Sequence, residues 1–222
     1  MIDSYERLLS QHISKEDFFK FGLEETIYIP NDKVEAEWQS LKKNIANNKA
    51  VFIRGFKSST SMHMASDFYS KVFENKQVKK DPSNTQNPAK IIEKLTGYKK
   101  AKDLKNYQLT SIFGRSRNIL AFCAPWNIVY IPSILDPLLS ADANTDLANE
   151  YKRRFMQHSY EKFKPYIDEF NLMISNHQFQ KSMDEYFQKL FDDGHFDKDE
   201  MIAFENTIRE DFAPIKLWKA WT

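Results

Sequence analysis

Glycine and cysteine are scarce in this chain, which has five glycines and one cysteine among 222 residues. Average usage would give roughly 7% glycine, so few residues are available for loops that wrap phosphates. Neither G-x-G-x-x-G nor G-x-x-x-x-G-K-[ST] occurs, which excludes dinucleotide-binding folds and P-loop NTPases. Because Cys123 is alone, an intramolecular disulfide and a C-x-x-C zinc site are excluded as well. Its apolar neighbours predict a buried and unreactive thiol.

Long apolar runs are also missing. No stretch approaches the roughly 18 apolar residues that a membrane span needs, and the charged amino terminus contains no apolar signal core. The longest apolar stretches, around residues 119–139, are interrupted by Pro125, Pro132 and Pro137. We therefore expect a cytoplasmic protein that does not associate with membranes.

The composition that remains favours helix. Apolar residues recur at helical spacing in most of the chain, whereas residues 27–29, 51–56 and 107–113 read as short extended segments. Ser14, three residues before Asp17, fits the start of a helix, and residues 146–180 are predicted to be helical with a kink at Pro165. The polar residues 81–88 indicate a loop. We expect a mainly helical α+β fold with a small β element embedded among helices. The chain is predicted to be one domain over residues 1–222. Its parts are N-terminal helices (1–50), a basic α+β segment (51–140) and a C-terminal helical segment (141–222).

Charge is distributed unevenly although the formal net charge is only +1. Between Lys76 and Arg117 eleven basic residues face three acidic ones, 11 − 3 = +8. Between Met183 and Asp211 three basic residues face ten acidic ones, 3 − 10 = −7. A segment this basic in a balanced chain is typical of a polyanion-binding face, although lysines that only solvate helix surfaces give the same count.

Known catalytic patterns are absent around the histidines. The five histidines form neither H-E-x-x-H nor a pair at metal-ligand spacing, so each is expected to be a surface or packing residue. His158 is the most interesting of them. It precedes aromatic residues at helical spacing, which more often form a core than a cofactor site.

One segment stands out against this background, the sequence N-I-L-A-F-C-A-P-W-N from Asn118 to Asn127. It resembles the second half of an HNH motif, the ββα-metal nuclease hairpin. The resemblance implies a ββα element whose first strand is residues 107–113 and whose second strand opens at Asn118. Asn118 would tie the loop together, and Asn127, on the following helix, would lie on or beside a Mg²⁺ or Mn²⁺ ion.

The resemblance fails at the catalytic pair. The positions that should read Asp-His are Thr110 and Ser111, and no histidine lies between His63 and His158. A histidine is needed there to deprotonate the attacking water, and a carboxylate to hold the metal ion. Neutral hydroxyls do neither well, so the sequence favours a degenerate nuclease site.

Three functions remain open. The first is a nucleic-acid-binding pseudo-nuclease that binds DNA phosphates, in a setting such as bacterial defence or a mobile element. The second is an active metal-dependent endonuclease in which His158 replaces the missing base. The third is a helical interaction protein whose C-terminal helices bind a partner or a second copy. The segment also fits an ordinary buried hairpin whose asparagines cap backbone groups. The predicted nucleic-acid contacts are Lys99, Lys100, Lys102, Lys105, Arg115 and Arg117.

Overall fold

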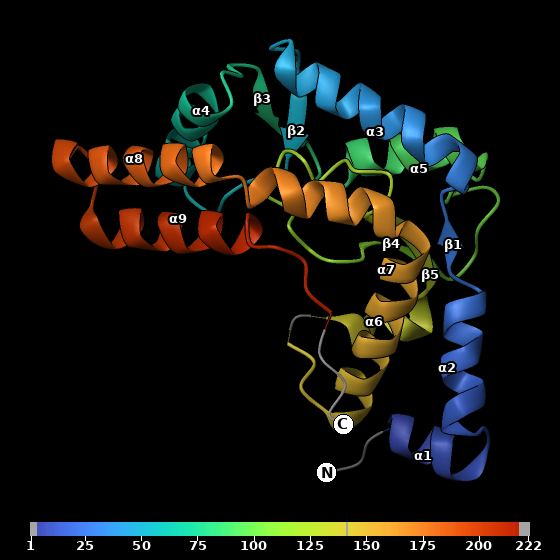
Figure 1. Cartoon of the computed structure of the whole chain (residues 1–222). Coiled ribbons are helices and arrows are strands. Elements are labelled where there is room, and N and C mark those ends of the chain that lie inside the picture. Colours follow the sequence, from blue (N-terminus) through green and yellow to red (C-terminus); the bar gives the residue numbers. More distant parts are fainter. Residues whose placement is uncertain (1–3, 141, 218–222) are drawn as a thin grey trace.

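A computed structural model describes residues 4–140 and 142–217. The described chain is mainly helical with a few short strands (Figure 1), which confirms the predicted α+β class. The helices are α1 (Ser4–Gln11), α2 (Lys15–Glu24), α3 (Asn31–Ala46), α4 (Ser59–Val72), α5 (Gln86–Thr96), α6 (Asp136–Leu139), α7 (Asp146–Ile174), α8 (His177–Asp193) and α9 (Lys198–Asp211). The strands are β1 (Ile27–Tyr28), β2 (Val51–Ile53), β3 (Val78–Lys80), β4 (Tyr107–Ser111) and β5 (Ile128–Pro132), and the 3₁₀ turn η1 is Ser133–Leu135.

A three-stranded antiparallel sheet with the order β1–β5–β4 organises the centre of the molecule. Directly paired residues share a face of such a sheet, and neighbours along a strand alternate. On one face Tyr28 packs edge-on against Phe163 of α7. On the other face Tyr130 lies toward α5, where burial and the Glu93 carboxylate raise its pKa to about 12. The long helix α7 and the short helix α5 therefore cover opposite faces of the sheet (Figure 1).

A small β–β–α unit is present in chain order, formed by β4, β5 and then η1 with α6. Its second strand begins at Ile128, so the prediction that this strand opens at Asn118 is wrong. Residues 118–127 form successive turns closed by backbone hydrogen bonds, such as Phe122 N–H to Asn118 C=O at 2.9 Å. Residues 118–127 are mostly apolar because these turns are buried on all sides.

A second, two-stranded parallel sheet of β2 and β3 lies between α3 and α4. Of its two strands, only β2 was predicted, within the extended segment 51–56. Beyond it, α4, α8 and α9 pack together at one end of the molecule (Figure 1). Phe68 of α4 is fully buried there and stacks on Phe187 of α8 at 5.9 Å between ring centroids.

Capping residues explain several helix boundaries. Ser14 accepts a hydrogen bond from Asp17 N–H at the start of α2, as predicted, and Gly97 ends α5 with φ +83°. The backbone of α7 is non-helical at Phe163, beside the kink expected at Pro165. The prediction of unbroken helix to residue 180 is wrong, because Asn176 caps the new helix α8.

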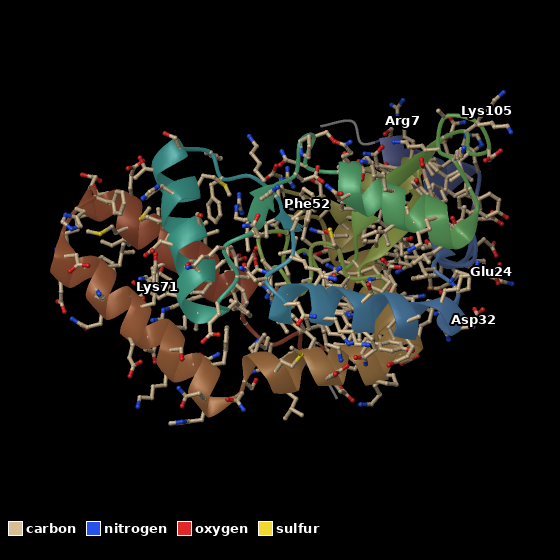
Figure 2. All side chains as sticks on the ribbon, turned by 90° about the horizontal axis from the view of Figure 1, so that it is seen from above. Arg7, Glu24, Asp32, Phe52, Lys71 and Lys105 are labelled. Atoms are coloured by element: carbon tan, nitrogen blue, oxygen red, sulfur yellow. The ribbon has the colours of Figure 1, made fainter. Side chains whose placement is uncertain are left out.

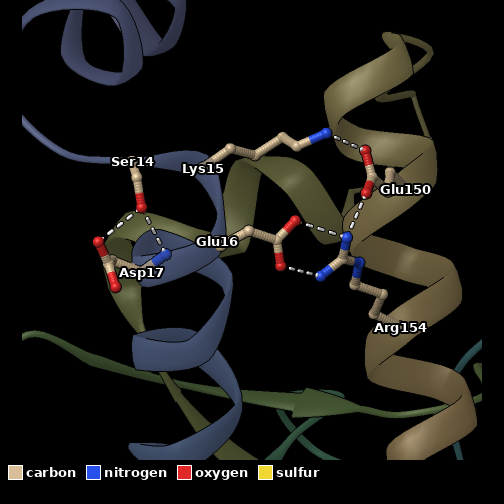
Figure 3. Close-up of polar contacts among 6 residues, drawn as sticks. All are labelled: Ser14, Lys15, Glu16, Asp17, Glu150 and Arg154. Atoms are coloured by element: carbon tan, nitrogen blue, oxygen red, sulfur yellow. Dashed lines mark hydrogen bonds and ion pairs between the residues drawn. The ribbon is translucent and has the colours of Figure 1, made fainter.

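Charged side chains fix α2 against the first half of α7 (Figure 3). The guanidinium of Arg154 donates to both oxygens of Glu16 at 2.6 and 2.8 Å, and to Glu150 at 2.6 Å. Lys15 joins Glu150 at 2.8 Å. The hydrogen bond from Arg154 lowers the pKa of Glu16, and the one from Lys15 lowers the pKa of Glu150. Such a bidentate network fixes geometry better than isolated surface pairs do.

Candidate anion-binding site

A small cavity with polar and apolar lining residues lies at the end of β4, and we call it the cup. Its volume is about 130 Å³. Segments far apart in the sequence line it: the end of β2, the loop before α5, strand β4 and the turns that follow. Its lining residues are Arg54, Asn84, Thr85, Pro88, Leu109, Thr110, Ser111, Gly114, Ser116, Phe122 and Ile128. The predicted pair Thr110 and Ser111 is therefore brought into a cavity.

The free edge of β4 supplies backbone donors to the cup. Ile112 N–H donates to Asn127 C=O at 3.0 Å, so Ile112 faces β5. Hydrogen-bonding direction alternates along an antiparallel strand, so the N–H and C=O groups of Ser111 and Leu109 point away from β5. β4 is an edge strand of the described sheet, and Leu109 and Ser111 both line the cup.

The loop before α5 is tied down around a buried carboxylate. Asp81 is fully buried and accepts hydrogen bonds from the backbone N–H groups of Ser83, Gln86 and Asn87 and from the Asn87 side chain. Burial opposes its ionisation, but these donors prevail and lower its pKa. Asn84, with φ +62°, accepts from Gly55 N–H at 2.9 Å, which holds the loop on the end of β2.

Arg54 is the cation that lines the cup, and the side chain of Lys80 packs on the neighbouring Gly55. Arg54 is exposed, and its guanidinium has no ion pair or hydrogen bond to any residue that the structure describes. The stem of Lys80 runs over Gly55 so closely that a Cβ there would lie 2.4 Å from Lys80 Cε. No residue with a carboxylate lines the cup, whereas Arg54, Asn84, Ser111 and Ser116, whose side chains carry donors, all line it. Such a donor-rich cavity suits an oxyanion.

The predicted lysine contacts lie at the opposite end of β4 and α5. Lys99, Lys100, Lys102 and Lys105 are exposed in the connection between these elements, and we call residues 98–106 the lysine loop. Among the eleven basic residues between Lys76 and Arg117, Lys94 has an ion pair with a described residue, at 2.9 Å to Glu37, and the others have none. Lys105 lies at the far end of the molecule from Lys71 and α8 (Figure 2). The eleven residues of α5 place the loop about 16 Å from the cup.

Both asparagines of the HNH-like segment are structural in this arrangement. Asn127 is fully buried: its oxygen accepts from Phe113 N–H, and its amide donates to the carbonyls of Gly114 and Ala121 at 3.0 and 3.1 Å. It precedes β5 and lies on no helix, so its predicted place on the helix that follows the second strand is wrong. Asn118 is also buried, and it ties the loop to Leu120 and to the end of α9. Hydrogen bonding to backbone groups therefore explains why asparagine occupies both of these buried positions.

The two loop arginines lie against α9, away from the lysine loop. Arg115, with φ +56°, donates from Nη1 to Glu210 C=O at 2.6 Å. Arg117 donates its backbone N–H to Asp211, and its guanidinium lies 5.0 Å from the centre of the Phe56 ring. Both are half-buried. The structure therefore does not bring them together with Lys99–Lys105 as one contact surface.

His158 lies outside the cup. Its ring is 6.0 Å from the ring of Tyr28, and it lines a separate hollow with Glu16, Lys20 and Arg154. Because β5 lies between β1 and β4, His158 is at the far edge of the sheet from Ser111. In residues 4–140 and 142–217, no group of three or more His, Cys, Asp or Glu side chains is placed to hold a metal ion.

Residues 29–217 match a family model described as "Uncharacterised protein PM1201". The chain belongs to this family. A relative in Pasteurella multocida (strain Pm70), with the printed name "Uncharacterized protein PM1201", is 35% identical over 169 residues, covering 75% of this chain and 76% of the relative. No solved structure matches the chain. The residues matched to the PM1201 family include all of the cup and the lysine loop.

Several cup residues of this PM1201-family chain were missed from the sequence. Arg54, Asn84, Thr85 and Ser116 come from segments that only the tertiary fold brings together. The polar run around Asn84 indicated a loop, but no spacing linked it to Thr110. Cys123 is buried as predicted, and burial raises the pKa of its thiol. No described helix is long and apolar enough to cross a membrane.

Proposed function

We propose that the protein binds nucleic acid, with the lysine loop neutralising backbone phosphates and the cup holding one phosphate group. The observation that carries the proposal is a set of exposed cations with no ion pair to a described residue. They are Lys90 on α5, Arg54 near the start of this helix, and Lys99, Lys100, Lys102 and Lys105 after its end. Counterion release makes such contacts favourable whatever the base sequence. The cup and the lysine loop lie about 16 Å apart along α5, so they would contact different phosphates of one strand.

Thr110 and Ser111 receive a different role from the one that the nuclease resemblance implies. Next to Arg54, the hydroxyl and the outward N–H of Ser111 are donors for phosphate oxygens, and Thr110 lines the cup beside them. A general base or a bound metal ion is not required for this role. The proposal is therefore binding, with no cleavage step assigned to these residues.

The test is fluorescence anisotropy with labelled DNA over a range of salt concentrations. We expect binding at about 50 mM salt that weakens steeply as salt rises. Replacing Lys99, Lys100, Lys102 and Lys105 with Gln should reduce the magnitude of the slope of log K against log salt by about three. R54A should weaken binding without affecting folding, because this side chain has no described partner.

The matched control replaces four exposed lysines elsewhere, Lys43, Lys49, Lys181 and Lys189, with Gln. This variant has the same change in net charge and should retain most of the affinity and the slope. The absence of any binding at about 50 mM salt would overturn the proposal. Equal losses in both quadruple variants would show a response to net charge alone and would also contradict it.

A further inference from the structure

Exposed apolar side chains gather beside the lysine loop. Six large apolar side chains are exposed in the described chain, and three of them, Phe21 (43%), Tyr98 (47%) and Ile134 (46%), lie at this end. Tyr98 directly precedes Lys99 in the loop. Scattered single residues of this kind need no explanation, but a cluster next to unpaired cations does.

Two of these side chains line one open hollow. Its volume is about 490 Å³, and Phe21 and Ile134 line it together with Lys105, Asn106, Tyr107, Pro132 and Ser133. Tyr107 donates its hydroxyl to Glu25 at 3.2 Å, and burial, this hydrogen bond and the neighbouring Tyr98 raise its pKa. Lys105 and Asn106 of the lysine loop also line the hollow, so the hollow adjoins the loop that begins at Tyr98.

We infer that this hollow takes an unpaired base, so that the nucleic acid bound by the proposed function is single-stranded. This inference rests on the proposed function. Aromatic faces next to cations are the arrangement that binds single strands, because every base has a face that can stack. A duplex keeps its bases stacked inside and presents only phosphates to such a hollow.

Charge complementarity favours a nucleic-acid strand over a second copy of the chain as the occupant of this hollow. A copy docking through the same surface would bring two sets of Lys99, Lys100, Lys102 and Lys105 together, which is unfavourable. A nucleic-acid strand brings one negative charge per nucleotide instead. Two acidic groups lie near this surface: Asp103 within the lysine loop, and Glu25, whose carboxylate accepts from Tyr107 of the hollow. We therefore expect E25Q to tighten binding of the strand.

Phe21 is held in place by the framework of its helix. It is on α2, which the network of Arg154, Glu16, Glu150 and Lys15 fixes against α7 (Figure 3). Ser14 caps the same helix. Because α2 is already anchored at its start, little conformational entropy is lost when a base stacks on Phe21.

The test compares a labelled oligothymidylate of about 20 nucleotides with a duplex of the same length, a span that exceeds the site size of typical single-strand binders. We expect the wild type to prefer the single strand. F21A and Y98A should each weaken single-strand binding by about fivefold or more and leave duplex binding unchanged. L172A, which removes an exposed apolar side chain from α7, is the matched control.

The outcomes separate this inference from the proposed function. Equal affinity for both nucleic acids, with F21A and Y98A unaffected, would overturn the inference and leave the proposed function standing. No binding to either probe would overturn both. A change in oligomeric state on F21A, measured by light scattering, without loss of single-strand binding would identify the hollow as an interface between copies and also contradict it.

Discussion

At the scale of single residues, Asn127 separates a structural role from a metal-binding one. Its amide group donates to two carbonyls while its oxygen accepts from one N–H, all in a site with no solvent exposure. N127D would place a carboxylate oxygen against the carbonyls of Gly114 and Ala121. We expect a loss of about 2–4 kcal/mol in the free energy of unfolding, because two acceptors lose their donor in a buried site.

Urea denaturation of N127D and wild type measures this change. T207A is a suitable control, because it removes an exposed hydroxyl that donates to Ala203 C=O within α9. A ligand of a divalent metal would behave differently, since a carboxylate holds Mg²⁺ better than an amide does. Undiminished stability of N127D, with added Mg²⁺ stabilising it further, would contradict the structural assignment.

At the scale of elements, the turns after β4 hold the end of α9. Asn118 donates to Asp211 C=O at 2.9 Å, and Arg117 N–H donates to the Asp211 carboxylate. Burial raises the pKa of this carboxyl above its ordinary value of 3.8, although Arg117 and Arg115 oppose the shift; Glu210 adds to it. The folded chain therefore binds the Asp211 proton more tightly than the unfolded chain does. Its contribution to stability is complete below pH 3.8 and is lost as the pH rises through the folded pKa.

D211N removes this titration and keeps an oxygen that can accept from Arg117 N–H. We expect the stability of D211N relative to wild type to increase as the pH rises from about 4 toward 7. Urea denaturation at several pH values measures the difference, with D184N as an exposed control. A difference that stays constant over this range would mean that Asp211 titrates alike in both states.

The β elements also show how far sequence reasoning reaches. The first strand could be predicted because residues 107–113 are locally extended and are followed by Gly114. The second could not be placed correctly, because an apolar run reads alike whether turns or a strand bury it. Only the observed pairing of Ser111 with Ile128 fixes the register. The cup could be predicted in part, since Thr110 and Ser111 were candidates but Arg54 and Asn84 join them only through tertiary contacts.

At the scale of the whole molecule, the lysine loop and the acidic helices lie at opposite ends. Lys105 and the lysine loop lie at one end, and α8 and α9, which hold most of the acidic residues between Met183 and Asp211, lie at the other (Figures 1 and 2). The uneven charge distribution seen in the sequence is therefore in part a separation in space, although Arg115 and Arg117 contact α9. The acidic end therefore affects a polyanion near the lysine loop only through its long-range electrostatic field.

The range of that field predicts how the acidic end affects binding. The Debye length is about 8 Å at 0.15 M salt and about 30 Å at 0.01 M. Replacing the exposed Glu185, Asp192 and Asp193 of α8 with their amides should change the affinity for single-stranded DNA by less than about twofold at the higher salt, where this field is screened. At the lower salt the same variant should bind more tightly than wild type. Anisotropy titrations at both salt concentrations measure the two affinities. An equally large gain at both would mean that the acidic end lies within a few ångströms of the bound strand, and the binding surface would then extend beyond the cup and the lysine loop.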